Sequence, residues 1–233
     1  MNDKKEISEL RQDPVGRDWV IISTGRAKRP SEYKSSTGQG QETPIEICPF
    51  EDPKKYGNEV VKSFSKKGES DWFVQVVNNK FPIAHGNACY MEEKRGPYSV
   101  QTQAAGYHEV VITRDHKKTF AQMPVEDVEI VIDAYKSRYF DLEVKDCAKY
   151  ILIFHNHGRD AGATISHPHS QILAIPYIPA DVRRSLEGAV NYHSERKRCV
   201  HCDILEWELK EKKRFFFENE NFAAVVPYVP KFS

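Results

Sequence analysis

Residues 150–175 decide the fold, and they read YILIFHNHGRDAGATISHPHSQILAI. The apolar run 150–154 predicts one strand and the apolar run 172–175 predicts another. The connection between them is rich in glycine and holds four of the nine histidines of the chain. His167, His169 and Gln171 lead into the second strand, where side chains alternate between faces. We therefore expect two imidazoles and an amide on one face of a sheet.

The rest of the chain predicts several more strands and only a few helices. Apolar residues recur with helical spacing after Pro124, with acidic residues in the first turns. Several strand hairpins with few helices favour an α+β fold over a parallel βαβ fold. The expected strands are residues 19–23, 73–77 and 108–113, the last two as neighbours in one sheet, and a pair at 215–218 and 223–226; further helices are expected from near 179 and over 199–213.

Composition excludes several classes of protein. The 233 residues carry 34 Lys and Arg and 34 Asp and Glu, so no net basic charge favours a nucleic-acid partner. No run reaches the roughly 20 apolar residues of a membrane span, so we expect a cytoplasmic protein without membrane contact. Five cysteines suit a disulfide framework poorly and favour metal binding. Cys89 and Cys147 are interpreted as ordinary small apolar residues.

The glycine-rich connection is a candidate phosphate-binding loop. Small residues between positions 158 and 163 let backbone N–H groups approach an anion, and Asn156 and Thr164 add side-chain hydrogen bonds. Such a loop alone is as often a plain strand connection. His167 and His169 directly after it favour the phosphate site.

The sequence His-Pro-His-x-Gln at 167–171 resembles the active-site signature of the galactose-1-phosphate uridylyltransferase family, the branch of the histidine triad superfamily in which glutamine replaces the third histidine. The similarity extends over nearly the whole chain. It comprises ELRQD at 9–13 with Gly16, WVII at 19–22, RAKRP at 26–30, NKFP at 79–82 and GYHEVVI at 106–112. The resemblance implies a histidine-triad-like antiparallel sheet with packed helices.

By this resemblance, His169 is the nucleophile that attacks the α-phosphorus of a nucleotide sugar and forms a covalent nucleotidyl-histidine. Gln171 then holds the phosphoryl oxygens, and because an amide has no acidic proton to donate, transfer is favoured over hydrolysis. Arg26 and Arg29 correspond to a basic pair that grips phosphate oxygens with the guanidinium fork. Without the resemblance, these two arginines would be interpreted as a solvated basic loop.

Other positions match residues that contact the nucleotide and its phosphates in the family. They are Asn79, Asn156, Gly162, Ala163 and Thr164. Lys80 stands where some uridylyltransferases carry aspartate, and Asn-Lys-Phe-Pro also suits relatives that transfer adenylyl groups. The choice between uracil and adenine stays open.

The resemblance also implies a zinc ion near the active site, held by Cys48, Glu51, His116 and His167. Glu51 replaces the second cysteine of the family pattern, but a carboxylate is a competent zinc ligand. The alternative is a site that has lost its metal, in which His167 only forms hydrogen bonds.

Cys199 and Cys202 form a Cys-x-x-Cys pair that predicts a second, structural zinc. Some family members complete this site with two histidines from later in the chain. No histidine follows His201 here, so the second site is expected to be incomplete.

Together these residues predict a UDP-glucose:hexose-1-phosphate uridylyltransferase of galactose metabolism, which moves UMP from UDP-glucose to galactose 1-phosphate in two steps through His169. One alternative is adenylyl transfer from ADP-glucose or a dinucleoside polyphosphate to phosphate or sulfate. Another is a non-catalytic nucleotide-binding or zinc-stabilised module. The expected partners are a nucleotide sugar, a hexose 1-phosphate and, by resemblance, a second copy in a homodimer.

Two regions are expected because the resembled family repeats its triad-like unit. Residues 1–178 would form one complete nucleotidyltransferase unit that contains the whole catalytic segment. Residues 179–233 would form a linker helix and the start of a second, incomplete unit.

Overall fold

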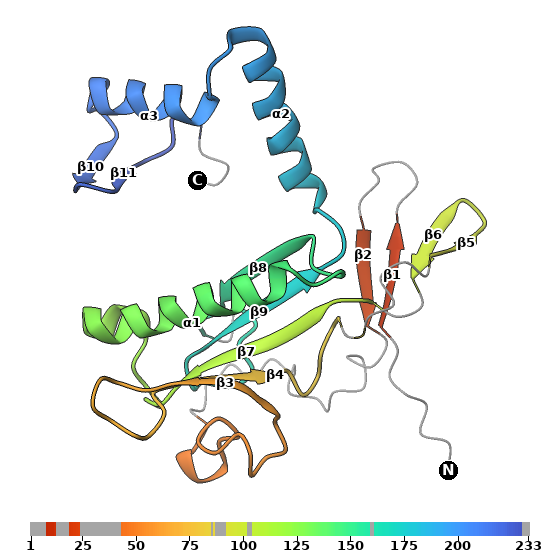
Figure 1. Ribbon diagram of the computed structural model, residues 1–233, viewed down its shortest axis with the longest axis vertical. Helices are drawn as coiled ribbons and strands as arrows, with labels where there is room; N and C mark the ends of the chain where they lie inside the picture. The colour runs from red at the N-terminus through yellow and green to blue at the C-terminus, as the bar shows by residue number, and fades with distance from the viewer. Residues whose placement is uncertain are drawn as a thin grey trace, which may run out of the picture. The chain divides into compact units, whose positions relative to one another are not determined.

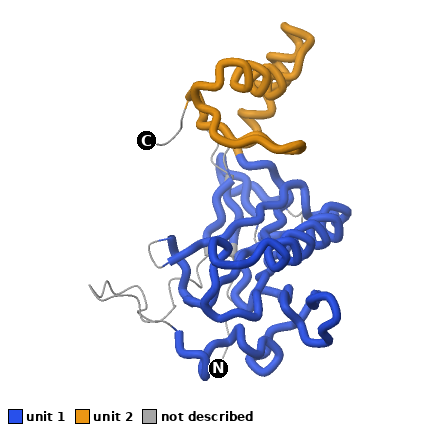
Figure 2. Tube along the Cα trace, turned by 90° about the vertical axis from the view of Figure 1, so that its left-hand side faces the viewer, with its two compact units in different colours: residues 1–179 blue, residues 180–233 orange. Residues whose placement is uncertain are grey.

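The structure is a computed structural model that describes residues 8–12, 19–23, 43–84, 86, 92–101, 104–158 and 161–229. The chain divides into two compact units, residues 1–179 and 180–233 (Figure 2). The assignment of residues 179–233 to the start of a second triad-like unit stays a prediction.

A five-stranded antiparallel sheet organises the first unit, in the order β3-β4-β7-β9-β8 (Figure 1). Its strands are β3 Val60–Phe64, β4 Val74–Asn78, β7 Tyr107–Thr113, β8 Tyr150–His155 and β9 His169–Ile175. Strands β4 and β7 are direct neighbours, as predicted for residues 73–77 and 108–113. The antiparallel sheet with its packed helix confirms the predicted α+β class.

Helix α1, Val125–Glu143, packs on one face of this sheet (Figure 1). It begins after Pro124, with Glu126 and Asp127 in the first turn, where carboxylates favour the positive end of the helix dipole. Side chains spaced three or four apart are buried toward the strands: Val131, Ala134, Arg138 and Leu142. The helix therefore covers the face of β9 that carries Ser170, Ile172 and Ala174, and leaves the face with His169 and Gln171 to the loops.

A buried ion pair joins α1 to β7. Arg138 Nε and Nη2 donate to Glu109 Oε2 and Oε1 at 2.8 and 2.6 Å, and the two residues are 8% and 3% exposed. Arg138 Nη1 donates to Asp141 Oδ2 at 2.7 Å. The hydrogen bonds to Glu109 raise the pKa of Arg138. A glutamate directly before the apolar run Val110–Ile112 of a predicted strand is the signal that could have revealed this pair, because a buried carboxylate needs a partner.

Gly106, just before β7, marks the closest approach between backbones. Its φ is +140°, and a Cβ built there would lie 2.2 Å from the carbonyl oxygen of Ala174. Only glycine fits this position without a shift of β9.

The first unit also holds a four-stranded antiparallel sheet, ordered β2-β1-β6-β5. Its strands are β1 Ser8–Gln12, β2 Trp19–Ser23, β5 Glu93–Arg95 and β6 Tyr98–Gln101. Of these four strands, only β2 was predicted.

Cys147, buried near Ala105, is disulfide-bonded, so its interpretation as an ordinary apolar residue is wrong. Spacing along a sequence cannot pair distant cysteines, and Cys89 lies outside the described residues.

The second unit contains helices α2, Ala180–Arg196, and α3, Val200–Glu211, followed by an antiparallel hairpin of β10, Phe215–Glu218, and β11, Ala223–Val225. These four elements were predicted. Among the described residues, none of the helices is long and apolar enough to cross a membrane.

Candidate active site

His169 begins β9, and the protein fixes which of its ring nitrogens carries the proton. Its Nδ1 atom lies 2.8 Å from the carbonyl oxygen of His167. A carbonyl only accepts, so Nδ1 is the donor and Nε2 carries the lone pair of a neutral ring. Phe50, which is buried, packs edge-on against the ring with the two centroids 4.9 Å apart. The ring is therefore held in one orientation with Nε2 as its free lone pair.

The surroundings of His169 favour the neutral ring. Burial lowers its pKa, against the hydrogen bond to the His167 carbonyl, which raises it. A neutral imidazole has an available lone pair on its unprotonated nitrogen, which is the form that nucleophilic attack by a histidine requires.

Gln171 lies two residues along the same face of β9. Its Oε1 accepts a hydrogen bond from His108 Nε2 at 2.8 Å. His108 is buried on β7, where its backbone pairs with Leu173. His169 and Gln171 therefore share one face, as alternation predicted.

A second cluster brings together Cys48, Glu51, His116 and His167, whose candidate ligand atoms all lie within 4.8 Å of one another. The nitrogens that face the cluster are the Nδ1 atoms of both histidines, 2.7 and 3.2 Å from Glu51 Oε1. Cys48 Sγ is 3.6 Å from His167 Nδ1. Residues predicted from three separate segments thus converge.

The outward nitrogens of both histidines show whether this donor set fits a metal. His167 Nε2 donates to the carbonyl of Thr113 at 2.7 Å, and His116 Nε2 donates to the carbonyl of Thr43 at 2.8 Å. Both Nδ1 atoms therefore face a carboxylate oxygen, and either a bound metal ion or a proton on one of these nitrogens would stabilise the arrangement. The donor set fits a small divalent ion.

Reciprocal hydrogen bonds attach the early cluster segment to the loop before β9. Thr43 N–H donates to Ser166 Oγ at 2.8 Å, and Ser166 N–H donates to Thr43 Oγ1 at 3.3 Å.

Burial of the cluster shifts two of its pKa values: it raises the pKa of the Cys48 thiol and lowers that of His167. A bound cation would reverse the effect on the thiol, because metals bind the thiolate.

The loop between β8 and β9 carries four of the predicted phosphate contacts. Gly158 and Gly162 adopt φ values of +78° and +84°. Ala163 N–H donates to the carbonyl of Gly158 at 3.1 Å, so this N–H is used within the loop. Thr164 is exposed and Asn156 is half-buried. The structure leaves their roles as predictions.

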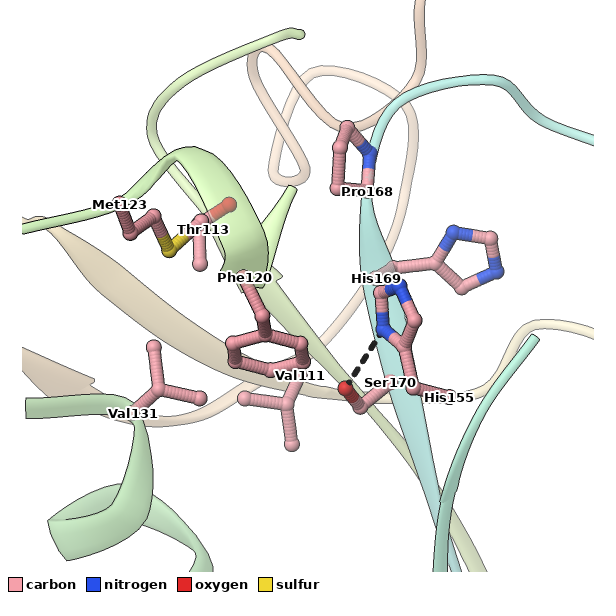
Figure 3. A pocket seen from close by; sticks show the side chains of 9 residues that line it. All are labelled: Val111, Thr113, Phe120, Met123, Val131, His155, Pro168, His169 and Ser170. Atoms are coloured by element: carbon pink, nitrogen blue, oxygen red, sulfur yellow. Dashed lines mark hydrogen bonds between the residues drawn. The ribbon is translucent and has the colours of Figure 1, made fainter. Parts of the chain in front are cut away.

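Figure 3 shows a small cavity near His169. The His155 ring lies beside Ser170, with Nδ1 3.1 Å from Oγ, whereas the His169 ring is directed away from the cavity. The cavity volume, about 10 Å³, is room for one water molecule. Its lining comprises Val111, Thr113, Phe120, Met123, Val131, His155, Pro168, His169 and Ser170. A cavity of this size cannot hold a nucleotide.

Of the remaining predicted residues, the structure describes Asn79, Cys199 and Cys202 but not the two arginines. Asn79 lies against His108, with Nδ2 3.1 Å from His108 Nε2. Cys199 and Cys202 are exposed at the start of α3, and no third Cys, His, Asp or Glu among the described residues completes a metal cluster with them. Arg26 and Arg29 lie outside the described residues.

The chain is similar to known proteins over nearly its whole length. The galactose-1-phosphate uridylyltransferase of Thermotoga maritima is 29% identical over 225 residues, 96% of this chain and 64% of its own length. The ADP-glucose phosphorylase of Arabidopsis thaliana is 31% identical over 224 residues, 94% of this chain and 62% of its own length. The chain thus spans a little under two thirds of either relative.

Solved structures give the same result. A uridylyltransferase matches with a TM-score of 0.67 at 25% identity, over 94% of this chain and 62% of that chain. The Arabidopsis thaliana ADP-glucose phosphorylase with bound ADP-glucose matches with a TM-score of 0.62 at 28% identity, over 93% and 62%. Residues 1–179 match the family model described as galactose-1-phosphate uridyl transferase, N-terminal domain. The chain therefore belongs to the galactose-1-phosphate uridyl transferase family.

Proposed function

We propose that this protein is a nucleotidyltransferase that moves UMP from UDP-glucose to galactose 1-phosphate through a nucleotidyl-histidine at His169. The observation that carries the proposal is the orientation of His169: Nδ1–H is bonded to the His167 carbonyl, and Nε2 keeps its lone pair. Membership of a uridyl transferase family supports the substrate class.

The proposed reaction has two displacement steps. The Nε2 lone pair attacks the α-phosphorus, the bond from phosphorus to the bridging diphosphate oxygen breaks, and its electron pair leaves with the hexose 1-phosphate. The Nδ1–H bond to His167 stabilises the positive charge that the ring gains. A phosphate oxygen of the acceptor then attacks the same phosphorus, and the N–P electron pair returns to Nε2. Gln171 would bind the phosphoryl oxygens in both steps through its amide N–H groups.

Intact mass spectrometry after incubation with UDP-glucose tests the proposal, because a covalent adduct adds the mass of a uridylyl group. We expect the adduct in the wild type, its loss on addition of galactose 1-phosphate, and no adduct in His169→Gly. His193→Gly, an exposed histidine of the second unit, is the control and should form the adduct. A wild type that forms no adduct with any nucleotide sugar would support the non-catalytic binding module instead.

Adenylyl transfer from ADP-glucose is the second candidate. The similarity to an ADP-glucose phosphorylase supports it, as does Lys80, which replaces the aspartate of some uridylyltransferases. Lys80 Nζ donates to the carbonyl of Tyr56 at 3.2 Å, so its cation is held at the loop before β3. The mass added after parallel incubations with UDP-glucose and ADP-glucose distinguishes the two, with inorganic phosphate as the acceptor that should remove an adenylyl group.

We also propose that Cys48, Glu51, His116 and His167 hold zinc. Zinc would link the Cys48–Glu51 segment to the loop after β7, through His116, and to the loop before β9, through His167. Glu51→Ala should lower the zinc content of purified protein measured by elemental analysis, whereas the double variant Cys199→Ala/Cys202→Ala should retain zinc at this cluster. Equal zinc loss in both variants would contradict the assignment. A homodimer and a cytoplasmic location stay predictions.

A further inference from the structure

His108 links a main-chain amide to the proposed phosphoryl-binding amide. Ile83 N–H donates to His108 Nδ1 at 3.2 Å. A backbone amide can only donate, so Nδ1 is the acceptor, and a neutral ring must then carry its proton on Nε2. The direction of hydrogen bonding through the ring is therefore set by the backbone.

The Nε2 proton in turn fixes the orientation of the Gln171 side chain. His108 Nε2 is 2.8 Å from Gln171 Oε1, and a ring N–H needs an acceptor there, which is the carbonyl oxygen and not the amide nitrogen of Gln171. Within the described part of the chain, the Gln171 amide nitrogen has no hydrogen bond. Both of its N–H groups stay available for an anionic ligand.

The same ring contacts a second amide that was predicted to meet the nucleotide. Asn79 Nδ2 lies 3.1 and 3.4 Å from the two ring nitrogens of His108. Asn79 is oriented separately, because its Oδ1 accepts from Phe81 N–H at 2.9 Å and its own N–H donates to the His108 carbonyl at 2.9 Å. One buried imidazole thus lies between the two amides of the site.

We infer that His108 is a positioning residue that turns the Gln171 amide so that its N–H groups, and not its carbonyl oxygen, face the phosphoryl group. This inference rests on the proposed function for its effect on the reaction. A glutamine with its amide reversed would present a carbonyl lone pair to the phosphoryl oxygens and repel them. The role is electrostatic orientation, since His108 itself need not touch the substrate.

Two near-isosteric substitutions separate this role from packing. The asparagine oxygen in His108→Asn can replace Nδ1 as the acceptor for Ile83 N–H, but it leaves no donor for Gln171. The glutamine nitrogen in His108→Gln can replace Nε2 as the donor to Gln171. We expect His108→Asn to slow nucleotidyl-histidine formation about 10- to 100-fold, with little change in the dissociation constant of the nucleotide sugar. His108→Gln should restore most of the rate.

The effect should also depend on Gln171. In a Gln171→Ala background, His108→Asn should cause no further loss of rate, because the group that it orients is absent. Equal losses in His108→Asn and His108→Gln, or losses that simply multiply with Gln171→Ala, would overturn the inference in favour of packing. Unfolding midpoints of all variants show whether each one folds.

A measurement without turnover separates this inference from the proposed function. Long-range proton–nitrogen NMR correlation on the wild type should show His108 as the Nε2–H tautomer. The Nδ1–H tautomer would overturn the inference whatever the activity. A wild type with the Nε2–H tautomer but no covalent adduct would keep the hydrogen-bond chain while overturning the proposed function, and with it any role of His108 in the reaction.

Discussion

Removing Arg138 should destabilise the first unit far more than an ordinary charge deletion. Arg138→Met removes the bidentate partner of Glu109 and leaves that carboxylate buried at 3% exposure. Breaking a buried ion pair from one side costs about 3 to 5 kcal/mol. Because a whole domain is typically stable by only about 5 to 15 kcal/mol, this loss is a large part of the total. Glu109→Leu combined with Arg138→Met should recover most of the loss, because neither charge is then buried alone.

Urea unfolding followed by circular dichroism measures both variants, with the shift in midpoint converted through a common slope. Lys136→Met on the same helix is the matched control. Lys136 pairs with Asp133 at 3.4 Å, but their side chains are 64% and 67% exposed, so its removal should cost less than about 0.5 kcal/mol. If Arg138→Met costs no more than Lys136→Met, or if the double variant is less stable than Arg138→Met, the reasoning about the buried carboxylate is wrong.

Three further outcomes are expected. Burial lowers the pKa of His155 below its usual value near 6.5, so the unfolded chain binds protons first and the unfolding free energy should fall as the pH drops below about 6.5. In His155→Gln the unfolding free energy should depend less steeply on pH, and an unchanged pH dependence would contradict the assignment. Gly106→Ala should lower the free energy of unfolding by about 2 kcal/mol or more, because its Cβ would lie 2.2 Å from the Ala174 carbonyl oxygen. The control Gly57→Ala, at φ +77° in open space, should cost about 1 kcal/mol in thermal unfolding. Equal costs would show that β9 shifts to accommodate the new side chain. Glu51→Cys should bind zinc more tightly than the wild type in a competition with a chelator, because thiolate is the softer ligand, and weaker binding would mean that the cluster cannot accept a second sulfur.

Strand β9, which carries His169, could be predicted in detail because the pattern that defines it is local. Alternation along β9 needs only the order of residues, and it placed His169 and Gln171 on one face. The cluster of Cys48, Glu51, His116 and His167 could not be predicted from spacing, and its agreement with the structure came through resemblance to a family.

What the sequence did not reveal depends on partners far apart in the chain. Arg138 lies between a serine and a tyrosine on a helix, a setting typical of a solvated side chain, and its partner Glu109 is 29 residues away. The Gln171 carbonyl that accepts from His108 lies 63 residues away from it. No repeating pattern in the sequence predicts either contact, so only the folded sheet shows them.

The two sides of β9 restrict how this segment can vary over evolution. Ser170, Ile172 and Ala174 pack toward α1 while His169 and Gln171 face the loops, and His167 reaches the cluster from the residue before Pro168. Substitution at 168 or 170 changes one side only. Insertion or deletion of a single residue between 167 and 171 would exchange the two sides, moving the imidazole into the helix-packed core and an aliphatic side chain into the site. We therefore expect variation here by replacement and never by a change in length.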